Sequence, residues 1–430
     1  MKILYDISVL GIGMSDAAAR TGIYRVVQTV AEHLVLRKDC QVQFCSMQPF
    51  HQSSLKYLQQ KKEFSDVSFS RPYSLKANAT TRRFELIDQV LKTPMPFTKK
   101  VSTKFQIRSL WMKEIIYDLL NKEDFLVNPR DLAHADIFHF NFSPIPKYIT
   151  KTKKRGIFLT KFDLIPVLYP HFSIEPIRKI FKDILDSINR DTWVLCISNA
   201  TRNDLLNYKG NAVDPDKVLV TELAASDEFY RSTDKELNRQ VREIYGIPET
   251  PYILSLCTLE PRKNIDQTIR AFAKIVQQEN ISDLNLVLVG AKGWMFDKIF
   301  EQIEASERVR KRIIITGYVA NNHLAALYSD ALFFVYPTLY EGFGLPPLEA
   351  MQCGTPVITS NTSSLPEVVG NAGIMVSPTD MDALCHAMLS IYKNPSLREQ
   401  MMQRSLDRAK HFTWEKCMQA TVNAYRASLV

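Results

Sequence analysis

Short apolar runs alternate with helix-length segments over most of the chain. Each run is apolar on both faces, which is typical of parallel strands that helices cover on both sides. Five runs lie in the first half, at residues 2–10, 42–47, 137–142, 156–162 and 193–198. Five more lie at residues 252–257, 284–290, 312–319, 332–337 and 355–359. The pattern predicts an α/β fold built on two series of parallel strands.

A polar and charged stretch, residues 231–250, separates the two series, and Pro248 and Pro251 lie at its end. Such composition is typical of a boundary between domains. We therefore predict two Rossmann-like domains with their boundary near this stretch.

Local signals also predict individual helices. Ser364 and Glu367 have the spacing of a capping box, and Pro366 falls in the first turn. Asp380 precedes an apolar helical segment and is expected to cap it. Six apolar residues recur at helical spacing and predict a core-facing helix: Ile174, Ile177, Phe181, Ile184, Leu185 and Ile188.

Composition narrows the class of protein. The chain has 430 residues, 46% hydrophobic and 23% charged, which fits a globular protein and neither a disordered nor a fibrous one. We expect no membrane span and no secretion signal, and hence a cytoplasmic protein, because no apolar run approaches about 20 residues. The seven cysteines form no Cys-x-x-Cys pair, so we expect neither a zinc site nor a disulfide framework.

The net charge of +8 belongs to the first half of the chain, since residues 1–225 hold 33 Lys and Arg against 23 Asp and Glu. Residues 71–113 alone hold ten basic and two acidic side chains, interleaved with aromatic ones. Such a segment fits a peripheral contact with an anionic membrane or a lipid pyrophosphate, and a solvated surface fits it equally well.

Glycine is scarce, and nine of the 14 glycines lie next to predicted strands, where a ligand can approach the backbone closely. Gly11 and Gly13 begin the dinucleotide fingerprint but the third glycine is missing, and Gly290 with Gly293 lacks the first pair. A nicotinamide enzyme is therefore a weak alternative. The absence of a GxxxxGK[ST] pattern from the sequence excludes P-loop ATPases.

The strongest candidate site lies at residues 336–354. A predicted strand leads into a glycine-containing loop, after which two prolines start a helix. The loop amides and the helix N-terminus favour a phosphate. Glu349, in the first turns of the helix, is placed to accept ribose hydroxyls. Glu341, which phosphates repel, is expected to bind neutral hydroxyls such as those of a sugar.

Glu341 and Glu349, with seven residues between them, resemble the E-x7-E signature of retaining nucleotide-sugar glycosyltransferases of family four, which have the GT-B fold. Further resemblances lie at residues 197–202, 259–264, 288–294, 317–319, 362–368 and 412–414. Residues 40–130 match no pattern that we recognise. The resemblance implies an acceptor domain at 1–228, a nucleotide-sugar domain at 229–408, and a helix at 409–430 that returns to the first domain.

The resemblance also implies roles for individual residues. Arg262 and Lys263 would hold the diphosphate, Glu341 the donor sugar and Glu349 the ribose. Other donor contacts are implied for Gly290, Tyr318, Val319, Gly342, Phe343, Gly344 and Leu345. The acceptor side is implied for Gly11, Gly13, Gly22, Tyr24 and Arg25. His139, at a predicted strand end, is a further cleft candidate, although a lone histidine is more often structural.

One departure from the family concerns residues 160–164, where many relatives have a histidine and this chain has Phe162. Phe162 cannot hydrogen-bond to the donor sugar. Asp163 remains, as a contact to acceptor or sugar or equally as a cap after the strand. No metal is expected, and the pairs Asp214 with Asp216 and Asp380 with Asp382 are interpreted as caps or surface residues.

The resemblance implies transfer of a hexose or deoxyhexose, with retention, from a nucleoside-diphosphate sugar to a hydroxyl of a glycan or lipid-linked glycan. Bacterial polysaccharide or O-antigen synthesis is the expected setting, and the nucleotide-sugar motifs disfavour a nucleic-acid partner. Two alternatives remain: a GT-B nucleotide-sugar epimerase, and a non-catalytic nucleotide-sugar-binding subunit, which Phe162 motivates.

Overall fold

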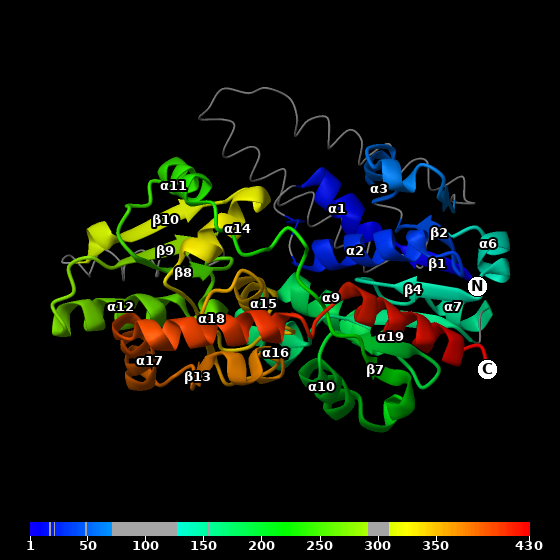
Figure 1. Cartoon of the computed structure of the whole chain (residues 1–430). Helices are drawn as coiled ribbons and strands as arrows, with labels where there is room; N and C mark the ends of the chain where they lie inside the picture. Colours follow the sequence, from blue (N-terminus) through cyan, green and yellow to red (C-terminus); the bar gives the residue numbers. More distant parts are fainter. Residues whose placement is uncertain (17–18, 21, 48–49, 71–126, 153–154, 291–308) are drawn as a thin grey trace, which may run out of the picture. The chain divides into compact units, whose positions relative to one another are not determined.

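The computed structural model describes residues 1–430 except 17–18, 21, 48–49, 71–126, 153–154 and 291–308. The described chain forms two compact units (Figure 1). Unit 1 contains Met1–Ile197, Arg202–Thr221 and Met418–Val430, and unit 2 contains Ser198–Thr201 and Glu222–Cys417. The chain thus changes unit more than once.

Unit 1 is built on a seven-stranded sheet in the order β3-β2-β1-β4-β5-β6-β7, and every pair in it is parallel. Its strands are β1 (Lys2–Asp6), β2 (Gln41–Cys45), β3 (Ser68–Phe69), β4 (Ile137–Phe140), β5 (Ile157–Lys161), β6 (Trp193–Cys196) and β7 (Val218–Val220). Its helices are α1 (Ser8–Ser15), α2 (Gly22–Leu36), α3 (His51–Gln59), α6 (Pro129–His134), α7 (Lys147–Thr152), α8 (Ile165–Leu168), α9 (Glu175–Ser187), most of α10 (Asn199–Lys209) and most of α19 (Trp414–Ala427).

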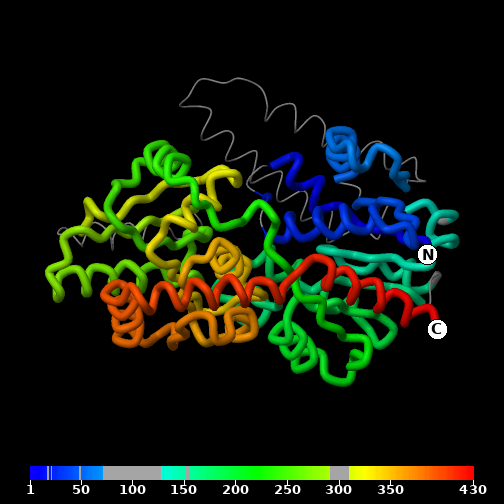
Figure 2. The backbone as a smooth tube through the Cα atoms, in the orientation of Figure 1, coloured from blue at the N-terminus to red at the C-terminus, as the bar shows by residue number. Residues whose placement is uncertain are grey.

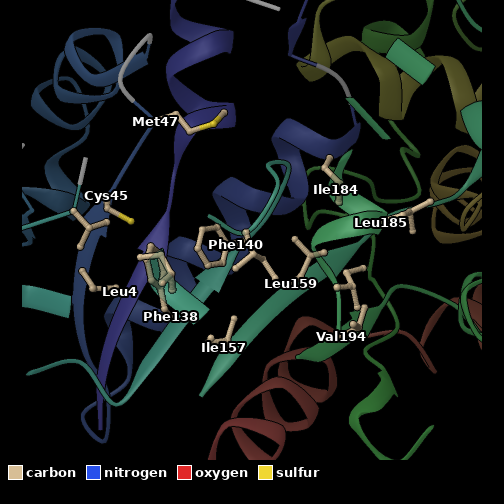
Figure 3. Packing of buried hydrophobic residues seen from close by; sticks show 14 of the residues in the cluster. Leu4, Cys45, Met47, Phe138, Phe140, Ile157, Leu159, Ile184, Leu185 and Val194 are labelled. Carbon is tan, nitrogen blue, oxygen red and sulfur yellow. The ribbon is translucent and has the colours of Figure 1, made fainter. Parts of the chain in front are cut away.

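Helices cover both faces of this sheet. Alternate strand residues such as Leu4, Phe140 and Leu159 project to one side and pack with Ile184 and Leu185 of α9 (Figure 3). The intervening residues project to the other side. There the Tyr5 hydroxyl donates to the Val27 carbonyl of α2 at 3.4 Å, and Phe158 and Tyr425 meet at 4.8 Å between ring centroids. The α19 helix, red in Figure 2, therefore covers the sheet of unit 1 although it comes last in the chain.

Unit 2 is built on a six-stranded, all-parallel sheet in the order β10-β9-β8-β11-β12-β13. Its strands are β8 (Tyr252–Leu256), β9 (Asn285–Val289), β10 (Ile313–Gly317), β11 (Phe333–Tyr336), β12 (Val357–Ser360) and β13 (Ile374–Val376). Its helices are α11 (Lys235–Ile244), α12 (Ile265–Gln278), α14 (Asn321–Asp330), α15 (Leu345–Gln352), α16 (Leu365–Val369), α17 (Met381–Lys393) and α18 (Pro395–Ala409). Two parallel sheets with helices between their strands confirm the predicted α/β class.

Several local predictions differ from the structure. The run at residues 2–10 is not one strand, because β1 ends at Asp6 and α1 begins at Ser8. The polar stretch at 231–250 contains α11, whereas the chain passes from unit 1 to unit 2 between Thr221 and Glu222. Of the apolar stripe on α9, Ile174 is 54% exposed, since it precedes the first turn.

Other features follow the sequence. All seven cysteines are free, and six of them are buried. In the part of the chain that the structure describes, no helix combines the length and apolar character that crossing a bilayer requires.

Candidate functional site

The loop that joins β11 to α15 has the strand–loop–helix form that the sequence predicts. Gly344 caps α15 with φ 115°, a conformation that favours glycine, and an added Cβ would lie 2.7 Å from Cδ2 of Leu365. Pro346 and Pro347 occupy the first turn, where an N–H has no helical partner to lose. The chain therefore turns sharply from the sheet into the helix over Glu341–Gly344.

Two serines hold the backbone of this loop. The Ser363 hydroxyl accepts the N–H of Glu341 at 2.9 Å, and Ser363 itself has a left-handed backbone with φ 53°. The Ser364 hydroxyl lies 3.0 Å from the carbonyl of Glu341 and 2.6 Å from that of Phe343, and donates to them. Ser364 makes no capping bond to α16, so the predicted capping box with Glu367 does not form.

The carbonyl of Gly342 is held by a different segment, Ser198–Thr201, which belongs to unit 2 although its chain neighbours belong to unit 1. Ser198 and Thr201 donate their hydroxyls to it at 2.6 and 3.2 Å. Glu367 holds the same segment, because its carboxylate accepts the N–H groups of Asn199 and Ala200 at 2.8 and 2.9 Å. Glu367 therefore binds this segment and does not form the predicted capping box with Ser364.

The carbonyls of Glu341, Gly342 and Phe343 all accept side-chain hydroxyls, and this fixes the direction of the loop N–H groups. In a trans peptide the N–H points away from the carbonyl of the same plane. The N–H groups of Gly342, Phe343 and Gly344 therefore face away from the hydroxyls that bind these carbonyls. Within the described residues, none of these three N–H groups donates a hydrogen bond. Successive N–H groups of this kind form a concave site that favours an anion.

Arg262 and Lys263 lie in a short 3-10 turn, Pro261–Lys263, in the segment that follows β8. The Lys263 ammonium donates to Oε1 of Glu341 at 2.7 Å and to the Tyr336 hydroxyl at 2.8 Å. Nη1 of Arg262 lies 3.0 Å from the same oxygen of Glu341. The structure thus brings together three of the residues that the sequence predicts, and adds Tyr336 to them.

Burial alone would raise the pKa of Glu341, since the residue is 8% exposed. The charges of Arg262 and Lys263 outweigh this effect and lower the pKa from 4.5 to about 2. Glu341 is therefore an anion at any physiological pH. The two cations reduce the repulsion that a nearby phosphate would exert on it.

Arg262 is anchored on both sides. Its guanidinium donates to the Tyr340 carbonyl at 2.6 Å and to Glu260 at 2.8 Å, and its own carbonyl accepts the N–H of Leu339 at 2.9 Å. Asn264, with φ 58°, donates to the carbonyl of Pro337 at 2.9 Å. The turn after β8 and the loop after β11 are therefore tied to each other through backbone as well as side chains.

The other predicted donor residues differ in exposure. Glu349, on α15, is 1% exposed and accepts the Tyr328 hydroxyl at 3.3 Å. Tyr318, after β10, is 76% exposed, while Val319 is buried. Packing alone requires glycine at position 290, because an added Cβ would lie 1.8 Å from the Cys257 carbonyl oxygen.

Predicted acceptor residues lie in unit 1, on two helices. Gly11 and Gly13 are inside α1 rather than in a loop, and an added Cβ would meet Ser54 at Gly11 and the Tyr24 ring at Gly13, both at 2.4 Å. These two glycines permit close helix packing. Gly22 begins α2, and Tyr24 and Arg25 follow it in the first turn, Tyr24 buried and Arg25 half-buried.

His139 lies inside β4 and is 1% exposed. Its Nε2 lies 2.7 Å from the Thr160 hydroxyl, and its Nδ1 contacts the hydroxyl of Tyr425. Burial lowers its pKa from 6.5 to about 3, so the ring is neutral. Both nitrogens thus have partners in unit 1, which is the structural role that the sequence allowed.

Phe162 and Asp163 follow directly after the last residue of β5. Phe162 is buried, and Asp163 accepts the N–H of Ile165 at 2.9 Å, as a cap at the start of α8 would. Lys161, which the sequence does not single out, is 3% exposed, with its ammonium 4.6 Å from the centroid of the Phe181 ring. Burial lowers the pKa of Lys161 to about 8.

The paired aspartates have local partners. Asp380 accepts the N–H of Ala383 at 2.9 Å as the predicted cap of α17, and Asp382 pairs with Lys274. Asp214 accepts the N–H of Asp216 at 3.2 Å. Among the described residues, no three His, Cys, Asp or Glu side chains are grouped as metal ligands.

Two predictions fall outside the described residues. These are the basic segment 71–113, proposed as a membrane or lipid-pyrophosphate contact, and Gly293.

The two parallel sheets define a class of fold. The structure resembles sucrose-phosphate synthase from Thermosynechococcus elongatus over 99% of this chain and 98% of that one, with a TM-score of 0.65 and 19% identity. At this identity the likeness concerns the fold alone. The chain has the GT-B fold, with two Rossmann-like domains, as the sequence predicts.

Sequence similarity reaches more specific relatives. Residues 238–408 match the family model described as "Glycosyl transferases group 1". O-antigen chain mannosyltransferase B of Escherichia coli is 37% identical over 253 residues, 58% of this chain and 64% of that protein. The serotype-specific mannosyltransferase WbdA of Escherichia coli is 28% identical over 266 residues, 61% of this chain and 32% of that protein. The chain therefore spans less than two thirds of the length of either relative.

Proposed function

We propose that the chain is a retaining glycosyltransferase that moves a hexose from a nucleoside-diphosphate sugar to a hydroxyl of a glycan or lipid-linked glycan. The observation that carries the proposal is the grouping of Arg262, Lys263 and Glu341 beside a loop whose three amides have no acceptor among the described residues. Two cations and free N–H groups suit a diphosphate, and a carboxylate beside them suits sugar hydroxyls.

The reaction breaks the bond between the anomeric carbon and the β-phosphate oxygen, and it forms a bond from that carbon to the acceptor oxygen. The acceptor proton passes to the departing phosphate on the same face of the sugar. Negative charge grows on the diphosphate, and fixed donors already in place stabilise it. The proposal assigns this role to Arg262, Lys263 and the loop amides and includes no metal ion.

Support for mannose as the sugar, and for O-antigen or related polysaccharide as the product, comes from the names of the relatives at 37% and 28% identity. We extend these properties to this chain as part of the proposal. Contact of residues 71–113 with an anionic membrane, on its cytoplasmic face, is a further part of it and rests on the charge of that segment.

The decisive experiment is calorimetric binding of GDP, UDP, dTDP, ADP and their common sugars, GDP-mannose first, followed by turnover with saccharide acceptors. Lys263→Ala and Glu349→Ala are expected to weaken binding of the selected nucleotide at least tenfold, because each removes a proposed donor contact. Lys274→Ala is the matched control, since Lys274 pairs with Asp382 at the surface of the same unit.

Proton NMR of the product tests retention, and turnover in excess EDTA tests the absence of a metal requirement. Binding of a nucleotide sugar without turnover on any acceptor would favour a non-catalytic subunit. If the folded chain binds none of the nucleotides, the proposed function is wrong.

A further inference from the structure

Three hydrogen-bond donors converge on one oxygen of Glu341. Lys263, Arg262 and the Tyr336 hydroxyl lie 2.7, 3.0 and 3.1 Å from Oε1. Within the described residues, Oε2 accepts no hydrogen bond. A carboxylate held at one oxygen has a fixed plane, and its second oxygen keeps its lone pairs for a ligand.

The three donors differ in what a diphosphate would do to them. Arg262 and Lys263 are the cations that the proposed function assigns to the phosphates, so a bound diphosphate competes with Glu341 for both of them. The hydroxyl of Tyr336 is neutral and is attracted to phosphate less strongly. It is therefore the donor that remains on Oε1 when the cations turn to the ligand.

Tyr336 is itself fixed. It is 2% exposed, it is the last residue of β11, and its ring stacks on Phe334 with centroids 5.7 Å apart. Lys263 also lies over this ring, 5.3 Å from its centroid. A hydroxyl on a rigid buried ring is a better reference point than a long, flexible lysine side chain.

We propose that Tyr336 is a positioning residue, whose hydroxyl holds Oε1 of Glu341 in place while Arg262 and Lys263 bind the donor diphosphate. Oε2 of Glu341 then faces the donor sugar in one orientation throughout the reaction. This inference rests on the proposed function and adds to it a residue that the sequence motif does not mark.

The test compares Tyr336→Phe with Tyr252→Phe. Tyr252 is a matched control because it is also fully buried, lies on the neighbouring strand β8, and donates its hydroxyl to a backbone carbonyl, that of Leu327, at 2.6 Å. Each variant loses the hydrogen bond that its buried tyrosine hydroxyl donates, so a purely structural effect of that loss appears in both. Tyr336→Phe also removes the hydroxyl that accepts the Lys263 ammonium. The readouts are thermal stability, the affinity for GDP and for GDP-mannose, or for the nucleotide pair selected above, and kcat.

For Tyr336→Phe we expect kcat to fall about 10- to 100-fold, the usual effect of losing a hydrogen bond to a charged group. The affinity for the nucleoside diphosphate should stay within about threefold, while the additional affinity contributed by the sugar is lost. Tyr252→Phe should retain both kcat and sugar affinity.

If the wild type is active and kcat is equal in the two variants, the role of Tyr336 is contradicted and the proposed function is not. An equal loss of affinity for the nucleoside diphosphate and its sugar also contradicts it, because Tyr336 would then act on the phosphates. A wild type that binds and transfers no nucleotide sugar contradicts the proposed function and this inference with it.

Discussion

At the scale of single residues, unit 1 buries two ionisable side chains whose pKa values burial lowers, His139 and Lys161. His139 inside β4 has a pKa of about 3, against 6.5 in an unfolded chain, because burial disfavours the charged ring. Its two nitrogens bond to Thr160 and Tyr425, and these contacts suit the neutral form. The residue therefore links the stability of unit 1 to pH.

The sign of this linkage follows from the lowered pKa. Between pH 6.5 and 3 the unfolded chain binds a proton at His139 that the folded chain does not, so unit 1 loses stability as the pH falls. The loss is about 1.4 kcal/mol per pH unit, or roughly 2 kcal/mol between pH 6.5 and 5. Urea unfolding of His139→Gln at both pH values should show a shallower dependence than wild type. His386→Gln, at an exposed position of α17, should keep the wild-type dependence; identical slopes in all three proteins would contradict the argument.

Lys161 gives a second prediction at this scale. Burial lowers its pKa from 10.5 to about 8, although Asp163 and Cys196 favour the charged form. At pH 7 the lysine is charged in both states, so the full cost of its burial is present. That cost diminishes as the pH rises from 8 toward 10.5, where the unfolded lysine remains protonated and the folded one does not.

Lys161→Met should therefore raise the free energy of unfolding at pH 7 by about 1 to 3 kcal/mol, and by less at pH 10. Chemical denaturation at the two pH values measures this difference. Lys179→Met, at an exposed position of α9, should change stability little. A loss of stability in Lys161→Met would mean that the ammonium makes a favourable interaction that outweighs its burial.

At the scale of elements, the loop from Glu341 to Gly344 is held by hydroxyl groups from other segments rather than by its own helix. Ser364 donates to two of its carbonyls, at 3.0 and 2.6 Å. Ser364→Ala removes both contacts and lets these peptide planes rotate. If the loop amides hold the diphosphate, the affinity for the nucleoside diphosphate should fall about tenfold, with about 1 to 2 kcal/mol lost in stability.

Calorimetric titration with the nucleotide selected above measures the change. Ser390→Ala is the matched control, because this hydroxyl also donates to a backbone carbonyl, that of His386, but within α17 and away from the loop. Unchanged affinity in Ser364→Ala would contradict the prediction, because nucleotide binding would then not depend on the orientation of the loop.

Elements with strong local signals were predictable from the sequence. The apolar runs mark most strands of both sheets, and the prolines at 346 and 347 mark the start of α15. The short strands β3, β7 and β13 have two or three residues each and leave no comparable run. The spacing of Ser364 and Glu367 predicts a cap, yet each side chain bonds to a segment distant in the chain, a competition that spacing cannot reveal.

The candidate site divides in the same way. Arg262, Lys263, Glu341 and Glu349 were predicted from a resemblance in sequence, and the structure groups the first three. Tyr336, Ser363 and Ser198 lie in segments that the sequence singles out. Their hydroxyls find partners only through tertiary placement, so the sequence does not assign these roles to them. The glycines at 11 and 13 have a packing role inside α1 that the sequence did not indicate, and their predicted place on the acceptor side stays a prediction.

At the scale of the whole molecule, unit 1 is completed by residues far away in the chain. Met418–Val430 belongs to unit 1, while the residues directly before it belong to unit 2. Tyr425 packs its ring on Phe158 and touches His139, on the face of the sheet that α2 also covers. The ion pair between Arg426 and Asp39 is solvent-exposed and contributes little, so the buried tyrosine carries the contact.

Ending the chain after Cys417 should therefore destabilise unit 1 and leave the fold of unit 2 largely intact. The deletion exposes the aromatic face around Phe158 and removes Tyr425, one of the two partners of His139. Burial of one large aromatic side chain is worth about 2 to 3 kcal/mol. Hydrogen exchange resolves the two units, because the amides of β1, β4 and β5 should lose protection while those of β8, β9 and β11 keep it. A chain that lacks only residues 428–430 retains Tyr425 and should exchange like the full chain. If the shortened chain loses protection equally in both sheets, the two units unfold as one, and the helix that completes unit 1 then stabilises unit 2 as well.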